Sequence, residues 1–234
     1  MLVILKRGGI LFLALLVIVS FLIFTLSREP SVETAAENTD IIVIDAGHGA
    51  PDGGARGVNT GILEKDINLS ISGKLSEKLR ANGETVLETR TSDEGLYTSE
   101  DASLRDKKRE DMKERVRLSK ESGVSLFISI HQNHFTDPKY SGPQIFYQKG
   151  SEEGKRLAEE IRASFLSTIG PHCTRETKPT GDLYILRQTK VPAVIIECGF
   201  LSNPEEEVLL MDEAYQNKLA DAICLGIENF KNGV

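Results

Sequence analysis

Four short segments place a histidine or a glutamate where an apolar run or a glycine-rich turn ends. His48 lies in D-A-G-H-G, Glu64 in T-G-I-L-E-K, His131 in L-F-I-S-I-H-Q-N and Glu197 in V-I-I-E-C-G-F. Two imidazoles and one carboxylate can fill three positions around a tetrahedral zinc ion and leave the fourth for water, whose proton a second carboxylate can move. These residue types therefore indicate a zinc hydrolase.

His48 and Glu64 each have an alternative interpretation. The glycine-rich turn around His48 could cradle a phosphate or serve only as a structural turn, although neither G-x-x-x-x-G-K-[ST] nor a true G-x-G-x-x-G is present. Glu64 could be an ordinary first-turn carboxylate, stabilised by the dipole of a helix that begins near residue 65. Taken alone, Glu64 is better explained by that role, whereas together with His48 a metal ligand is an equally good explanation.

The remaining candidates differ in how rigidly the chain holds them. His131 directly continues an apolar strand, whereas His134 already lies in the following loop, so His131 is the better candidate for a ligand. A carboxylate at the end of a buried strand, such as Glu197, is unfavourable unless it is paired, hydrogen-bonded or near a cation. A catalytic role for Glu197 is therefore favoured over a buried salt bridge.

Strand and helix patterns alternate along the chain from residue 40 onward. This alternation predicts an α/β fold with an open, mostly parallel twisted sheet and helices on both faces. Because reactive groups in such sheets collect at the carboxyl ends of the strands, His48, His131 and Glu197 should meet at one edge. The expected strands span residues 41–44, 84–89, 126–130, 144–148, 183–186 and 191–196, and helices are expected to begin near residues 65, 103, 152, 204 and 213.

The beginning of the chain is predicted to lie outside this domain. Lys6 and Arg7 precede an uncharged apolar run at residues 8–26, close to the roughly 20 residues that cross a bilayer and longer than the about 7–15 residues of a cleaved signal. We therefore expect an N-terminal transmembrane helix, with residues 1–27 as a membrane anchor or uncleaved signal, residues 28–39 as a linker and residues 40–234 as the catalytic domain. The basic flank places that domain on the extracytoplasmic side.

Charge and cysteine content limit the other roles. A net charge of −7 without a basic stripe argues against a nucleic-acid partner, and the mixed charges of residues 105–117 predict a solvated helix face. The three cysteines allow no complete disulfide framework. Cys198 and Cys224 fall in apolar patterns typical of packing, and Cys173, in a loop, is the only one for which reactivity stays open, although the sequence does not favour it. The neighbouring His172 is predicted to be an exposed loop residue.

The motifs taken together resemble a known family. D-A-G-H-G, G-x-x-E-K, L-F-I-S-I-H-x-N and V-P-A-V-I-I-E-C-G-F-L-S-N-P-E-E, in this order and at these separations, are similar to the motifs of the zinc-dependent N-acetylmuramoyl-L-alanine amidases. The resemblance covers about residues 41–230. A short domain behind one membrane anchor, without cell-wall-binding repeats, is most similar to the spore-cortex, germination-specific amidases.

The resemblance implies individual roles. His48, Glu64 and His131 match the zinc ligands, Glu197 matches the catalytic glutamate, and Asn133 matches the family's S-I-H-x-N position. The implied reaction is hydrolysis of the amide between the lactyl group of N-acetylmuramic acid and L-alanine, in a peptidoglycan glycan strand with its stem peptide, during spore cortex maturation.

Further residues near these motifs are candidates for supporting roles. Asp45, Asn133 and His134 could hold a ligand or contact substrate, and His134 departs from the small or polar residue usual in the family. Asp45 could orient a ligand imidazole from behind or cap the amides of its own loop. Three basic residues could recruit the anionic stem peptide to an acidic enzyme: Arg175, Lys178 and Arg187.

Other functions remain open at this point. Another zinc peptidase acting on the stem peptide is one alternative, although H-E-x-x-H is absent. A non-catalytic, membrane-tethered glycan-binding module is a second, and it would not need Glu197. Three ligands hold zinc less securely than four, so a catalytically weak domain that requires an activating protein partner is a further hypothesis.

Overall fold

The computed structural model describes residues 40–99, 101–171 and 173–233, which belong to a compact unit at Asn38–Val234. The predicted anchor and linker at residues 1–39 lie outside the described residues, and so does His172. Within the described ranges, no helix combines the length and the hydropathy that crossing a bilayer requires.

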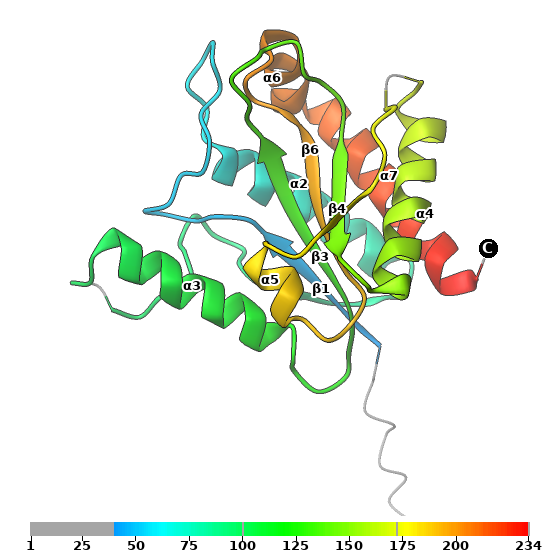
Figure 1. The fold of residues 1–234 in the computed structure, drawn as a ribbon, viewed down its shortest axis with the longest axis horizontal. Coiled ribbons are helices and arrows are strands. Elements are labelled where there is room, and N and C mark those ends of the chain that lie inside the picture. Colours follow the sequence, from blue (N-terminus) through cyan, green and yellow to red (C-terminus); the bar gives the residue numbers. More distant parts are fainter. Residues whose placement is uncertain (1–39, 100, 172, 234) are drawn as a thin grey trace, which may run out of the picture. The chain divides into compact units, whose positions relative to one another are not determined.

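The centre of the fold is a six-stranded mixed sheet with the order β2-β1-β3-β6-β4-β5 (Figure 1). Four neighbouring strands run parallel, as the sequence predicts, whereas β4 pairs antiparallel with β6, and β5 runs parallel to β4. The expected mostly parallel sheet is thus found in its larger part, and the last two strands are reversed. The strands are β1 (Ile41–Ala46), β2 (Thr85–Glu88), β3 (Val124–Asn133), β4 (Gln144–Gln148), β5 (Lys178–Thr180) and β6 (Ala193–Phe200).

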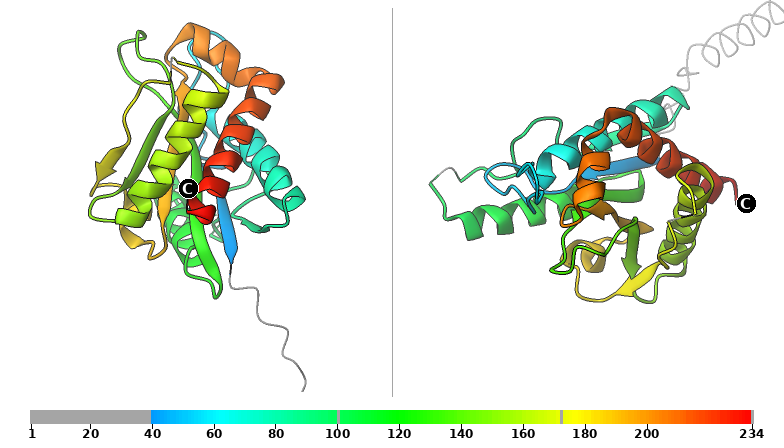
Figure 2. Two further views of the ribbon diagram at one scale, coloured as in Figure 1. Left: turned by 90° about the vertical axis from the view of Figure 1, so that its right-hand side faces the viewer. Right: turned by 90° about the horizontal axis from the view of Figure 1, so that it is seen from above.

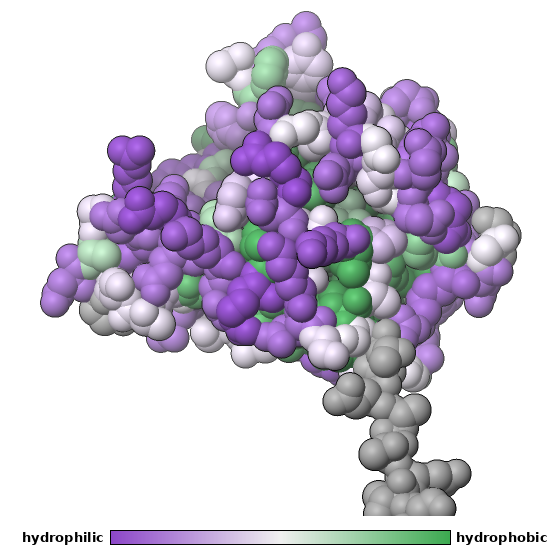
Figure 3. Space-filling view, turned by 60° about the horizontal axis from the view of Figure 1, so that its bottom comes forward, coloured by the Kyte–Doolittle hydropathy of each residue, from purple (hydrophilic) through white to green (hydrophobic). Residues whose placement is uncertain are grey.

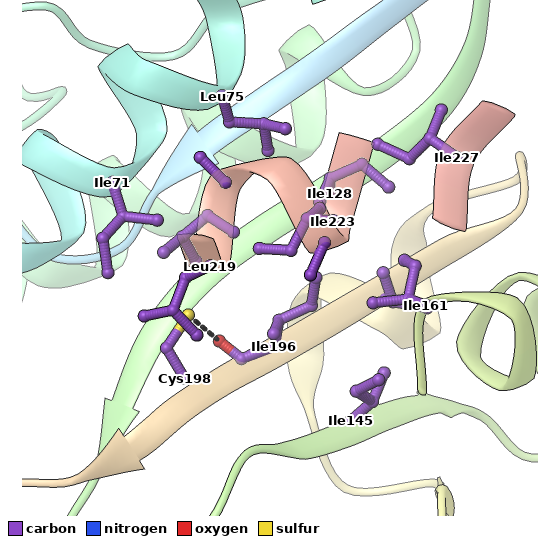
Figure 4. Close-up of a cluster of buried hydrophobic side chains, with 14 of the residues drawn as sticks. Ile71, Leu75, Ile128, Ile145, Ile161, Ile196, Cys198, Leu219, Ile223 and Ile227 are labelled. Carbon is purple, nitrogen blue, oxygen red and sulfur yellow. Dashed lines mark hydrogen bonds between the residues drawn. The ribbon is translucent and has the colours of Figure 1, made fainter. Parts of the chain in front are cut away.

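Helices cover both faces of the sheet, as the alternating pattern predicts (Figures 1 and 2). The larger apolar core lies between the sheet and α2 (Glu64–Ala81), α4 (Glu152–Thr168) and α7 (Glu213–Asn232), and Figure 4 shows its centre. The opposite face carries a smaller core under α3 (Leu104–Leu118) and the short α5 (Tyr184–Gln188). Helix α6 (Pro204–Met211) follows β6 and packs against it and α7.

The two faces differ in how completely they are covered. Three long amphipathic helices bury the first face, because their apolar residues recur on one side. The second face is covered by α3, which is rich in charged residues, and by the five residues of α5. On the side shown in Figure 3, the surface is mostly hydrophilic, and apolar side chains remain visible between charged ones.

The structure corrects the sequence prediction between residues 178 and 188. The expected strand at residues 183–186 is wrong, because this segment begins helix α5, in which Ile185 and Leu186 are buried against the smaller core. Periodicity cannot separate helix from strand in so short an apolar run. The strand β5 was not expected, because it contains Pro179, which argues against a central strand; the structure places β5 at the edge of the sheet, where proline is tolerated.

The prediction that residues 105–117 form a solvated helix face is wrong for Arg115, whose side chain is 2% exposed. Its guanidinium forms an ion pair with Asp45, which is equally buried, and a second with Asp111 at 2.6 Å. Burial alone would raise the pKa of Asp45, but the charge of Arg115 and a hydrogen bond from Ser129 lower it. The guanidinium also donates to the backbone oxygens of Ala46 and His48, so it ties α3 to the end of β1.

The structure argues against reactivity at Cys173, the one cysteine for which the sequence left that role open. Its side chain is buried, and burial raises the pKa of the thiol to about 11, with the Glu206 charge adding to the effect. Since the thiolate is the reactive form, a buried thiol with a raised pKa is a poor nucleophile near neutral pH. Cys198 and Cys224 are buried packing residues, as predicted.

Replacing Arg115 with methionine should lower the free energy of unfolding by about 3–5 kcal/mol, because Asp45 would lose its buried counter-charge. Urea unfolding followed by circular dichroism would measure this loss. The matched control is Arg117→Met on the same helix, where the exposed arginine pairs with Glu114 and Glu121 and its removal should change stability little. Equal effects of the two substitutions would contradict the structural role of Arg115.

Candidate metal centre

Three of the predicted residues meet at the carboxyl edge of the sheet. His48 lies in the loop after β1, Glu64 is the first residue of α2, and His131 lies near the end of β3. One nitrogen of each imidazole and one oxygen of the carboxylate all lie within 4.8 Å of one another. The rings of His48 and His131 meet edge to face, with their centroids 5.0 Å apart. Residues far apart in the sequence thus form one cluster of metal-type ligands.

Backbone geometry and two neighbouring side chains fix His48. Its φ of 62° lies in the left-handed region, which residues other than glycine seldom adopt. Arg115 donates to its backbone oxygen at 2.5 Å, and the Nδ1–H of its ring donates to Asp52 Oδ2 at 2.9 Å. The Nε2 atom is left facing Glu64 Oε1 at 3.2 Å. Holding one ring nitrogen with a carboxylate is how proteins orient metal-binding histidines.

Glu64 is 4% exposed and is surrounded by donors. The backbone N–H of Ala55 donates to Oε2 at 2.8 Å, and the backbone N–H of Gln132 donates to Oε1 at 3.1 Å. The Nδ1 atom of His131 lies 2.9 Å from the same Oε1.

The ring of His131 depends on a glycine in the loop after β1. A methyl group at Gly47 would lie 2.3 Å from the His131 ring, so only glycine leaves room for that imidazole.

The charges of the cluster support one another. Burial disfavours the charged forms of both Glu64 and His48. Hydrogen bonds and opposite charges within the cluster have the larger effect on both pKa values and favour the charged forms. Hydrogen bonds from His131 and His48 hold the pKa of Glu64 far below its usual range. Hydrogen bonds to Asp52 and Glu64 raise the pKa of His48 to about 9. A metal ion that takes this place would have to displace the proton of His48.

Glu197 lies beside the cluster on the neighbouring strand, where it is the register partner of His131. Its Oε2 atom is buried and has no hydrogen-bond partner among the described residues. Burial raises the pKa of Glu197 to about 7, and the charge of Glu64 adds to this while the histidines oppose it. A carboxylate that can gain or lose a proton near neutral pH is suited to general acid–base catalysis.

The three residues proposed for supporting roles are placed differently. Asp45 is not hydrogen-bonded to an imidazole or to the amides of its loop within the described chain, and bonds instead to Arg115, Thr89 and Ser129. Asn133 ends β3, and its backbone oxygen accepts from the N–H of Leu201 at 2.8 Å. His134 is exposed beyond the strand and does not belong to the three-residue cluster.

Asp52 and Lys108 were not identified from the sequence. Asp52 holds His48 and also pairs with Lys108 of α3 at 2.7 Å. The only signal in the sequence is the spacing of four residues between His48 and Asp52 within a glycine-rich loop. Conversely, none of the basic residues suggested for substrate recruitment lines the hollow beside His48: Arg175, Lys178 and Arg187.

The donor set fits a zinc ion. Imidazole nitrogen and carboxylate oxygen are common zinc ligands, and catalytic zinc sites typically have three protein ligands. The three ligand atoms already face one another, the Nδ1 atom of His48 is held by Asp52, and the buried Glu197 Oε2 lacks a protein partner beside them. Such an arrangement can support hydrolysis of a carbonyl compound.

Comparison with known proteins adds an independent observation. Residues 42–229 match the Amidase_3 family profile, which describes N-acetylmuramoyl-L-alanine amidases. The germination-specific N-acetylmuramoyl-L-alanine amidase of Bacillus subtilis (strain 168) is 37% identical over 187 residues, which cover 80% of this chain and 78% of that protein.

Solved structures agree with this match. The CwlD amidase from Clostridioides difficile, solved in complex with the GerS lipoprotein, is similar with a TM-score of 0.81 and 40% identity, over 83% of this chain and 99% of that one. The catalytic domain of CwlV, an N-acetylmuramoyl-L-alanine amidase from Bacillus (Paenibacillus) polymyxa var. colistinus, has a TM-score of 0.70 and 31% identity, over 82% and 98% of the two chains.

In the metal-free protein, Glu197→Gln should stabilise the fold at alkaline pH. The pKa of Glu197 rises from 4.5 to about 7 on folding, so ionisation destabilises the native state. This penalty is absent below about pH 4.5, grows up to about pH 7 and then stays constant at about 3 kcal/mol, because each pKa unit corresponds to about 1.4 kcal/mol. Urea unfolding in chelator should therefore show the variant more stable at pH 8 and equal to the parent at pH 4.5. A gain that does not change with pH would contradict this.

Proposed function

This chain belongs to the N-acetylmuramoyl-L-alanine amidase family and is a hydrolase of amide bonds, and we propose that it is a zinc enzyme of the spore cortex. The bond cut is the amide between the lactyl group of N-acetylmuramic acid and L-alanine. The observation that carries the zinc proposal is the cluster of His48, Glu64 and His131 with the unpartnered oxygen of Glu197 beside it.

The proposed ligands are His48, Glu64 and His131. When bound there, zinc would polarise the substrate carbonyl and make a water molecule acidic near neutral pH. Asp52 keeps the Nδ1 proton of His48, so Nε2 is the atom presented to the site. Arg115 and the backbone donors around Glu64 hold the ligands in place before any metal arrives.

Glu197 is the proposed catalytic residue. Its Oε2 atom, which no protein group satisfies, would take a proton from the attacking water. The same oxygen would then return that proton to the nitrogen of L-alanine as the amide bond breaks, so that a free carboxyl group and a free amine result. The raised pKa of Glu197 suits it to both steps.

The proposed location follows from the relatives and from the N-terminal sequence. A germination-specific relative supports action on the spore cortex. The apolar run at residues 8–26 supports a membrane anchor, with the catalytic domain on the extracytoplasmic side, where peptidoglycan lies.

An activating protein partner is also proposed. The CwlD amidase was solved in complex with the GerS lipoprotein, and 99% of that amidase chain matches this one. The Glu64 carboxylate and a protonated His48 already satisfy each other, which opposes metal entry. A partner that favours the metal-bound arrangement would raise zinc occupancy.

The test is to measure zinc content and muropeptide products of the purified complete chain beside Glu197→Gln. Both proteins should bind zinc, and the variant should lose about 10²–10⁴-fold in kcat, because general acid–base catalysis contributes about that factor. The matched control is Glu205→Gln on α6, an exposed glutamate whose replacement should leave kcat unchanged.

The outcomes separate the parts of the proposal. Zinc in both proteins with full activity in Glu197→Gln would contradict the role of Glu197. Absence of zinc even in excess metal would contradict the ligand set, unless adding a cell extract or a purified lipoprotein partner restores both zinc and products, in which case the partner is required.

A further inference from the structure

The segment after Glu197 reads C-G-F-L-S-N-P-E-E-E, and the proposed reaction gives it no role. It passes from the end of β6 into α6, which lies directly beyond that strand (Figure 1). Glu206 and Glu207 of this helix are buried, at 7% and 0% exposure, whereas the preceding Glu205 is exposed. A buried carboxylate is costly unless hydrogen bonds satisfy it. The bonds that the two carboxylates accept therefore show which segments they hold.

Glu206 holds the end of β6 just beyond Glu197. In the register of β3 and β6, His131 pairs with Glu197, and the next pair along the strands is Asn133 with Phe200. Strand β6 thus has one residue more than β3 between these pairs, so it bulges directly after Glu197. Bulges interrupt the ladder and change the direction of side chains, and they are frequent beside active sites. The backbone N–H of Phe200 donates to Glu206 Oε2 at 2.8 Å, which anchors the bulge to α6.

The other oxygen of Glu206 holds the loop after β3. The backbone N–H of Gly142, near the end of that loop, donates to Glu206 Oε1 at 2.8 Å. One carboxylate thus joins the bulge of β6 to the segment that follows His131. An amide in the same place would offer one acceptor oxygen to two N–H donors, so glutamine could satisfy only one of them.

Glu207 holds a different segment, the loop that connects the proposed ligands His48 and Glu64. Its Oε2 atom accepts from the backbone N–H of Asn59 at 2.7 Å. Its Oε1 atom accepts from the backbone N–H of Thr60 at 2.9 Å and from the hydroxyl of the same residue at 2.7 Å. Three hydrogen bonds from one buried carboxylate therefore fix the far end of this loop to α6.

The anchored end of this loop is continuous with the metal cluster. A methyl group at Gly57 would lie 2.2 Å from Glu207 Oε1, so the loop packs directly against the carboxylate. Two residues earlier, the N–H of Ala55 donates to Glu64 Oε2 at 2.8 Å, and the oxygen of Ala55 accepts from the backbone N–H of Glu64 at 3.0 Å. A displacement of the loop would therefore reach both the side chain and the backbone of Glu64.

We propose that Glu206 and Glu207 are positioning residues with separate tasks: Glu206 aims the carboxylate of Glu197, and Glu207 holds Glu64 in place as a metal ligand. This inference rests on the proposed function. Each carboxylate acts through the backbone segment that it binds. Loss of Glu206 should therefore slow catalysis without weakening zinc binding, whereas loss of Glu207 should weaken zinc binding. A helix that only supports the fold would show no such separation.

The test compares three consecutive glutamates of α6 in the complete chain: Glu206→Gln, Glu207→Gln and, as the exposed control, Glu205→Gln. Zinc affinity is measured by competition with a chromophoric chelator. The values of kcat and KM come from muropeptide release in saturating zinc, and stability comes from urea unfolding.

Glu206→Gln should lower kcat at least about 10-fold with KM and zinc affinity unchanged, because small displacements of a catalytic group are costly. Glu207→Gln should weaken zinc binding at least about 10-fold, as expected when the support of a ligand is lost, and should keep its kcat in saturating zinc. Glu205→Gln should match the parent in every measurement.

Equal losses of zinc affinity in Glu206→Gln and Glu207→Gln would indicate a structural role alone and overturn the proposal. An unchanged kcat in the first variant or an unchanged zinc affinity in the second would also overturn it. Where a glutamine variant does not fold, the aspartate variant, which keeps the charge but is one methylene shorter, takes its place with the same expected directions.

Crystal structures of the two variants give a readout that does not need activity. Glu197 should be displaced in Glu206→Gln and Glu64 in Glu207→Gln, and unmoved carboxylates would overturn the proposal. A parent chain that binds zinc but releases no amidase products, while its variants show these displacements, would contradict the proposed function alone.

Discussion

A carboxylate taken out of water at the start of α2 organises the whole site. Glu64 can be ionised there only because one backbone donor from the loop after β1, one from the end of β3, the amide of Asn68 and two imidazoles all face it. Satisfying it fixes the loop after β1, the beginning of α2 and the end of β3 in one place. Without metal, the attraction between the Glu64 carboxylate and the two imidazoles offsets the cost of burying the carboxylate. The same attraction brings together the nitrogen and oxygen atoms that would bind a metal ion.

A second buried charge extends this arrangement to the other face of the sheet. Arg115 neutralises Asp45 below the site and reaches the backbone oxygen of His48, so α3 supports the left-handed backbone of that residue. Asp52 and Lys108 form a parallel link from the same helix to the ring of His48. Glu197 is the exception, since one of its oxygens lacks any partner among the described side chains and backbone groups. An unsatisfied buried group of this kind lowers the stability of the fold, and proteins commonly accept such a loss at sites where the group is needed for activity.

Much of the site follows from the sequence because it depends on strand ends. Parallel strands deliver the residues after them to the same edge, so the motifs around His48, His131 and Glu197 predict their proximity without any knowledge of packing. The roles of Arg115 and Asp52 could not be predicted, because they depend on which side chains of a charged helix and a glycine-rich loop turn inward. The helix α5 was mistaken for a strand because its few apolar residues fit either period. The antiparallel direction of β4 could not be predicted either, because the hydrophobic pattern of a short strand is the same in both directions.

The central claim is that His48, Glu64 and His131 hold the metal. X-ray absorption spectroscopy at the zinc edge of the metal-loaded complete chain tests this claim directly, because it reports the type and number of the ligands. The account predicts a shell of nitrogen and oxygen at about 2.0–2.2 Å with the outer-shell signature of two imidazoles and no sulfur. A third imidazole, which would have to come from His134 or His172, or a sulfur ligand at about 2.3 Å would contradict it.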